Sequence, residues 1–243
     1  MKKKFGAILL LSVAILSGCS SDNIHNQDSN EVSSEQQETL KDTIDAKLIG
    51  ISEDKKVKLY EEANGVKLDI NGNQKEFSWN YPGDTGTEPQ VFYTDVTGDG
   101  KEETVMIIQT GRGTGLSHYE IHVVNTDDLN EIKVQSYEEI VANHIETHVA
   151  KKEDGTLAIT VKANGNEYNF NYGWDPAPNQ KPDRLGFGGV YTYYLEDQKI
   201  KLNLGAAVPG TAAYVCEFNI TYKYDKAKNE FVVDQIEVIP IEI

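Results

Sequence analysis

Two residue types on which many extracellular folds and binding surfaces depend are scarce in this sequence of 243 residues: it has two cysteines and two arginines. The cysteines, Cys19 and Cys216, are too few for a disulfide framework or a cysteine-based zinc site. The formal net charge is −16. An acidic chain with few arginines argues against nucleic acid as a partner, because phosphate binding depends on Lys and Arg.

Common signatures of enzymes are missing as well. The sequence contains no Gly-x-Ser-x-Gly elbow and no HExxH zinc motif. The glycine-rich segment 111–115 precedes an alternating, strand-like pattern, so we interpret it as a hairpin loop and not as a phosphate cradle, which needs a helix N-terminus. Cys216 shares a predicted strand face with aromatic and aliphatic residues, which indicates a buried thiol and not a nucleophile.

The first 19 residues have the pattern of an export signal. Lysines at positions 2–4 precede a largely apolar run over 5–16, which is too short to span a bilayer comfortably. The sequence at 16–19, Leu-Ser-Gly-Cys, resembles the lipobox of bacterial lipoproteins. The resemblance implies that residues 1–18 are a signal peptide and that Cys19 carries acyl chains such as palmitate. Such chains would anchor the protein to a membrane outside the cytoplasm.

The stretch that follows Cys19 is polar. It is rich in Ser, Asn, Gln, Asp and Glu and nearly free of aromatic residues, so it cannot bury enough apolar surface to fold. We expect residues 19–45 to be the lipidated cysteine and a flexible tether, and residues 46–243 to form a globular β-rich domain. Loss of residues 1–18 removes three lysines and no acid, so the formal charge becomes −19.

Beyond residue 45, apolar and polar residues alternate in short runs, which is typical of strands with one buried face. Examples are 57–60, 66–70, 157–161, 200–204 and 231–239. Asn-Gly and Asp-Gly pairs separate several of these runs, and such tight turns favour antiparallel hairpins. The sequence therefore predicts a mainly β fold of antiparallel sheets, arranged as a sandwich, as packed sheets or in a propeller-like way.

One segment departs from the two-residue period. From residue 136 to about 147 the apolar positions are spaced for one helix face, and Ser136 with Glu139 fits a capping box. We expect one short helix packed on the sheets. The proline-rich segment 172–183 predicts a long loop between two sheets. Whether the folded part is one domain or two subdomains stays open.

The segment 94–103 is the one motif with recognisable ligand chemistry. Oxygen-bearing groups recur with the spacing of a loop that wraps around a hard cation: Asp95, Thr97, Asp99, the main-chain carbonyl of Lys101, and Glu103. Gly100 permits the sharp turn. We predict one structural calcium ion here. The alternative is an ordinary hairpin turn, since Asp and Gly also favour turns.

This loop resembles the FG-GAP or VCBS-type repeat of extracellular proteins, in which an Asp-x-Asp-x-Asp-Gly loop lies between two strands. The positions that match are Asp95, Asp99, Gly100 and Glu103. Thr97 departs from the pattern and removes one charge, which should weaken ion binding. The match covers only about residues 90–110. The wider pattern over 111–125 resembles an uncharacterised group of Gram-positive surface lipoproteins, which implies a location but no activity.

Four of the five histidines fall close together. His118 and His122 alternate with Glu120 along one predicted strand face, and His144 and His148 are four residues apart. Both spacings are compatible with zinc ligands, although partly buried histidines without a metal are the simpler interpretation.

These features lead to one main functional prediction and two alternatives. We expect a membrane-anchored extracytoplasmic module that is not an enzyme, binds an envelope protein or a polysaccharide, and is stabilised by calcium. One alternative is an envelope enzyme or accessory subunit that uses the histidines as a metal site. The other is a scaffold of an envelope complex.

Overall fold

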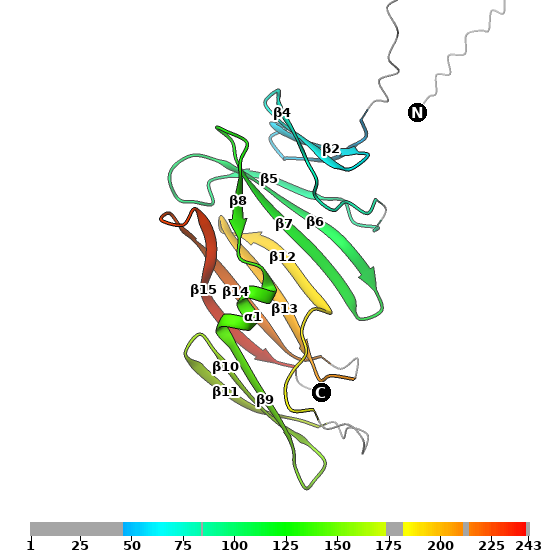
Figure 1. The fold of residues 1–243 in the computed structure, drawn as a ribbon, viewed down its shortest axis with the longest axis vertical. Helices are drawn as coiled ribbons and strands as arrows, with labels where there is room; N and C mark the ends of the chain where they lie inside the picture. Colours follow the sequence, from blue (N-terminus) through cyan, green and yellow to red (C-terminus); the bar gives the residue numbers. More distant parts are fainter. Residues whose placement is uncertain (1–45, 84, 174–181, 211–213, 242–243) are drawn as a thin grey trace, which may run out of the picture. The chain divides into compact units, whose positions relative to one another are not determined.

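The alternating segments of the sequence form strands. The computed structural model describes residues 46–83, 85–173, 182–210 and 214–241, which form fifteen β-strands and one α-helix (Figure 1). The predicted signal peptide, Cys19 and the tether lie outside these residues. The predicted mainly β fold class is confirmed, and of the arrangements considered the structure has packed sheets.

The first sheet is an antiparallel meander in the order β1-β2-β3-β4. Its strands are β1 (Leu48–Ile51), β2 (Val57–Glu62), β3 (Gly65–Ile70) and β4 (Asn73–Phe77). The β3–β4 turn has Asn71 at φ 52° and Gly72 at φ 91°, the left-handed pair that a two-residue type I′ hairpin requires. β1 is an edge strand whose register with β2 shifts between Leu48 and Gly50.

The second sheet has the order β11-β10-β9 and is also antiparallel. Its strands are β9 (Ile145–Lys151), β10 (Leu157–Ala163) and β11 (Asn166–Tyr172). Asn164 and Gly165 form its second turn, again with positive φ. The predicted proline-rich loop follows β11 and leads towards the third sheet, and its central residues 174–181 lie outside the described residues.

The third sheet has eight strands in the order β12-β13-β14-β15-β8-β7-β6-β5. The strands are β5 (Gln90–Thr94), β6 (Glu103–Gly113), β7 (Leu116–Asn125), β8 (Glu131–Val134), β12 (Val190–Glu196), β13 (Lys199–Ala207), β14 (Tyr214–Asp225) and β15 (Glu230–Pro240). β12 also pairs with β7, which closes a ring of six strands. The β7–β12 and β8–β15 pairings are parallel, a feature that alternation along the chain does not predict.

The helix of the described residues is α1 (Tyr137–His144). Ser136 caps it as predicted: its hydroxyl accepts the N–H of Glu139 at 3.3 Å, and the Glu139 carboxylate accepts the N–H of Ser136 at 3.0 Å. The helix ends before the predicted residue 147, because Ile145 has an extended backbone and begins β9, which pairs with β10. In the described part of the chain no helix is long and apolar enough to cross a membrane.

Two hydrophobic clusters join these elements. The smaller lies between the first sheet and one face of β5, β6 and β7, with Leu68 and Met106 fully buried in it. The larger combines residues of the third sheet, Ile140 of α1 and the second sheet. Cys216 lies in the larger cluster, where burial raises the pKa of its thiol to about 12. The predicted burial of this thiol is confirmed.

Candidate functional sites

The predicted cation loop connects β5 to β6, whose residues Thr94 and Glu103 are paired. At the start of the loop, Oδ1 of Asp95 accepts the N–H of Gly98 at 2.7 Å and Oδ2 accepts the N–H of Gly100 at 2.9 Å. Both glycines have positive φ, 76° and 88°, which is accessible to glycine without strain. Desolvation opposes the charge, but the main-chain N–H donors prevail and lower the pKa of Asp95.

Glu103 is the buried acid of this loop, with 2% of its surface exposed. Its Oε2 accepts the N–H of Val96 at 3.1 Å and of Thr97 at 3.3 Å, and its Oε1 accepts the Thr97 hydroxyl at 3.4 Å. Burial raises the pKa of Glu103, and the charges of Asp99 and Asp95 add to this, against the effect of the two N–H donors. Keeping this buried carboxylate charged therefore costs free energy of folding.

The loop between β7 and β8 contacts the 94–103 loop through side chains of both. Oδ1 of Asp99 accepts the N–H of Lys101 at 2.9 Å, while the Lys101 ammonium forms an ion pair with Asp127 between β7 and β8. The Thr126 hydroxyl donates to the carbonyl of Glu102 at 2.8 Å. Throughout the described residues, no group of three or more His, Cys, Asp or Glu side chains is arranged to hold a metal ion. The predicted ligands lie in one loop, with their carboxylates engaged by main-chain N–H groups.

His122 on β7 is held by two acids and an indole ring. Its Nδ1 lies 2.7 Å from Oε1 of Glu131, and its Nε2 lies 3.7 Å from Oε2 of Glu120. The Trp79 ring stacks on the imidazole at a centroid distance of 4.1 Å, and its Nε1 donates to Oε2 of Glu131 at 3.2 Å. Burial lowers the pKa of His122, but the two carboxylates outweigh it and the pKa is raised. Analysis of the sequence missed Trp79 and Glu131, which distant segments bring to His122.

The other clustered histidines lie on three elements. His118 on β7 stacks on Tyr191 with centroids 4.6 Å apart, and Tyr191 stacks on Tyr137 of α1 at 4.5 Å. His144 is the last residue of α1 and His148 lies on β9, so the two histidines do not lie on one helix face. These histidines make no three-ligand group with one another or with acids of the described chain.

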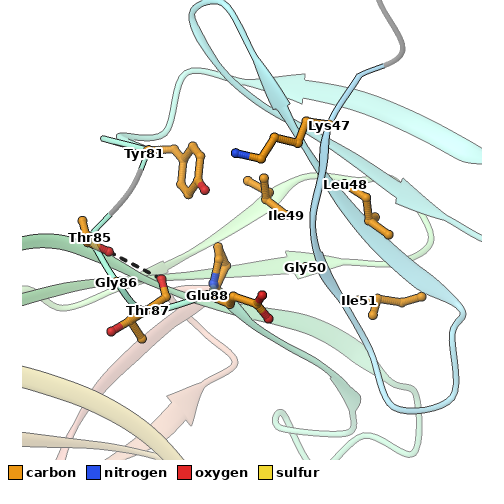
Figure 2. Close-up of a pocket in the computed structure, with 12 residues that line it drawn as sticks. Lys47, Leu48, Ile49, Gly50, Ile51, Tyr81, Thr85, Gly86, Thr87 and Glu88 are labelled. Atoms are coloured by element: carbon orange, nitrogen blue, oxygen red, sulfur yellow. Dashed lines mark hydrogen bonds between the residues drawn. The ribbon is translucent and has the colours of Figure 1, made fainter.

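A cavity of about 690 Å³ lies between β1 and residues of the two segments 81–83 and 85–89 (Figure 2). Residues 47–51 form one wall, whereas β2, the partner of β1, contributes none of the lining residues. The lining residues of this cavity come from β1 and from the segment that precedes β5. We call it the β1 slot. Its volume is in the range of ligand-binding sites, which is about 300–1,000 Å³.

The two faces of β1 differ in chemistry. Figure 2 shows Ile49 pointing towards the side of Tyr81, and Leu48 and Ile51 pointing away from it. Ile49 is buried, whereas Leu48 is 49% and Ile51 43% exposed. The register shift between Leu48 and Gly50 explains why side chains three positions apart share a side. The opposite wall is polar, and Thr85 there donates its hydroxyl to a main-chain carbonyl. No pattern in the sequence predicts this cavity beyond the apolar character of β1.

Comparison of the chain with protein-family models, with curated proteins and with solved structures found no match.

Proposed function

We propose that this chain is a lipid-anchored extracytoplasmic binding module that is not an enzyme and that engages an envelope protein or a polysaccharide through the β1 slot. The anchor is supported by the lipobox-like sequence that ends at Cys19. The observation that carries the binding function is the slot itself, an open cavity with two half-exposed apolar side chains, Leu48 and Ile51, on one wall. Exposed apolar side chains on a strand that lines a cavity gain contact area when a partner covers them.

Sedimentation with isolated envelope material tests this function. The full chain with Cys19→Ala is used, so that lipid insertion does not contribute to sedimentation. We expect it to sediment with envelope fragments and the double variant Leu48→Lys/Ile51→Lys to stay in solution. The control Leu116→Lys changes a residue that is 47% exposed on β7 and should behave like the parent. Equal sedimentation of parent and double variant would remove the β1 slot from the binding function.

A second proposed activity of the same protein is structural calcium binding by the 94–103 loop. The supporting observation is the buried Glu103 carboxylate, whose pKa is raised by burial and by its acidic neighbours Asp99 and Asp95. A divalent cation would relieve this repulsion, and calcium accepts the carboxylate, hydroxyl and carbonyl oxygens that the loop offers. The bound ion would stabilise the turn between β5 and β6. It has no catalytic role in this proposal.

A further inference from the structure

We propose that this chain has a second binding site, for a neutral saccharide, in a polar cavity between the β10–β11 turn and a face of the third sheet. The cavity has a volume of about 370 Å³, which is at the lower end of the range of ligand-binding sites. We call it the polar groove. None of its lining residues lines the β1 slot, so the inference does not rest on the function proposed for that slot.

The floor of the polar groove is one row of directly paired residues across four neighbouring strands. Tyr194 of β12 pairs with Lys201 of β13. Lys201 also pairs with Thr221 of β14, which pairs with Gln235 of β15. Side chains of directly paired residues lie on one face, with Cβ atoms about 4.5–5.5 Å apart. The next residue, Ile220, is buried in the larger hydrophobic cluster. The pairing therefore brings a ring, an amine, a hydroxyl and an amide to one polar surface.

The β10–β11 turn forms the opposite wall and is held in place at two points. The main-chain N–H of Asn164 donates to the carbonyl of His144, the last residue of α1, at 3.3 Å. The side-chain amide of Asn164 donates to the carbonyl of Asp234 at 3.3 Å. Asp234 is the extra residue of a β-bulge, where the register of β14 with β15 shifts. The groove thus has a preformed wall, which reduces the ordering cost of binding.

The groove offers hydrogen-bonding side chains that the protein itself does not use. Four of its lining residues have no side-chain hydrogen-bond partner among the described residues: Asn166, Tyr194, Thr221 and Gln235. Amides and hydroxyls supply both donors and acceptors, as the hydroxyls of a sugar require. Tyr194 is half-buried and presents an apolar ring beside its hydroxyl, which suits the mixed apolar and polar surface of a sugar ring.

The charges of the groove disfavour an ionic ligand. The lining has one cation, Lys201, and one anion, Glu237, although the whole chain has a formal net charge of −16. Lys201 forms an ion pair with Glu196 of β12, which compensates its charge. A phosphate or carboxylate ligand would need cations that are not already paired. A neutral ligand matches this balance.

The strands of the floor also disfavour a peptide that adds as a new strand. β13 and β14 are each paired on both sides, so their main-chain groups are engaged within the sheet. A ligand above them must be recognised by side chains. We therefore infer a mono- or disaccharide unit, free or part of a longer chain, that is held by the amide and hydroxyl groups of the groove.

Two matched double variants allow the test, both in the full chain with Cys19→Ala. The groove variant, Thr221→Val/Gln235→Met, removes a hydroxyl and an amide and keeps side chains of similar size. The control variant, Thr94→Val/Gln90→Met, makes the same changes on β5, outside the groove. In each pair the threonine is half-buried and the second residue is exposed, so the two variants are comparable in burial.

Binding to an array of immobilised neutral, acidic and amino sugars is measured first, and calorimetry with the retained sugars follows. The parent should retain neutral sugars, and the groove variant should bind them at least tenfold more weakly, because polar groups of the ligand lose their partners. The control variant and the double variant of the β1 slot should bind like the parent. Added salt should change the affinity little, since charges contribute little to it.

Three results would overturn the inference: no neutral sugar retained by the parent, equal binding by the parent and the groove variant, or retention of charged sugars alone. Thermal melting checks that the groove variant folds. If it does not, Asn166→Ala replaces it, because Asn166 is exposed at the start of β11. If the β1 slot variant still sediments with envelope material while neutral sugars bind the groove, the function proposed for the slot fails and the saccharide site stands.

Discussion

Nδ1 of His122 on β7 lies 2.7 Å from Oε1 of Glu131 on β8, and the indole of Trp79 covers the same imidazole. Trp79 lies in the segment between β4, which belongs to the first sheet, and β5, which belongs to the third. It is 7% exposed and also stacks on Phe77 at a centroid distance of 4.2 Å. These contacts join the first sheet to the third sheet by stacking and by charge-assisted hydrogen bonds.

The His122 contacts predict a dependence of stability on pH. Because the folded pKa of His122 is raised above the ordinary histidine value of 6.5, its stabilisation is present below that value and is lost as pH rises through the folded pKa. We expect the free energy of unfolding in urea to fall as pH is raised from about 6 to about 9. His122→Gln should flatten this dependence, and His148→Gln, an exposed change on β9, should not. The same slope in His122→Gln would assign the pH dependence to other groups.

Because Trp79 is buried and stacks on two rings, we expect its replacement to lower the free energy of unfolding. Two variants, Trp79→Ala and Trp79→Phe, separate the contribution of the ring from that of its N–H group. Trp79→Ala should lower the free energy of unfolding by about 3–5 kcal/mol, because it removes a buried ring and two stacking contacts. Trp79→Phe keeps an aromatic ring and loses the N–H donor to Glu131, so a smaller loss of about 1 kcal/mol is expected. Urea unfolding gives both numbers. Equal losses would mean that the hydrogen bond and not the stacking dominates.

Calcium should stabilise the folded chain by about 2.7 kcal/mol when the free ion is a hundredfold above its dissociation constant. Thermal melting with chelator, calcium or magnesium measures the effect, and magnesium should do less because it requires a smaller octahedral site. Asp99→Ala should abolish most of the shift, and Thr97→Asp should enlarge it by adding a charge to the loop. Asp154→Ala, in the turn before β10, is the matched control. No shift with calcium in the parent would leave the 94–103 segment as a self-contained turn.

The N-terminal sequence predicts that Cys19→Ala releases the protein from membranes without changing its melting temperature. In the proposed arrangement, acyl chains on Cys19 would supply the anchor, at about 0.8 kcal/mol per buried CH₂, and the polar sequence after Cys19 would separate them from the folded part. Detergent phase partitioning measures the first claim and circular dichroism the second. Retention of the Cys19→Ala chain in the detergent phase would contradict the lipid anchor.

Local features of the fold were predictable from the sequence. The Asn71–Gly72 and Asn164–Gly165 pairs identify two hairpins, because their backbone conformations are rare for other residues. Ser136 and Glu139 identify the start of α1, because each satisfies an N–H of the other. These signals act within a few residues, so one sequence is enough to read them.

Contacts between distant segments were not predictable. The parallel pairing of Tyr191 with His118 joins strands more than seventy positions apart and has no turn signal. The contact of Trp79 with Glu131 depends on how the first sheet packs on the third. The β1 slot likewise depends on the approach of residues 81–83 and 85–89 to β1. The position of each of these features is fixed by tertiary packing, which periodicity does not encode.

The most direct test of the central claim is amide hydrogen exchange of the full Cys19→Ala chain with and without solubilised envelope material. The account predicts slower exchange at residues 47–51 when the material is present, and unchanged exchange around Leu116, an equally exposed apolar position on β7. Unchanged exchange at residues 47–51, in the presence of material with which the chain sediments, would contradict the claim that the β1 slot is its binding site.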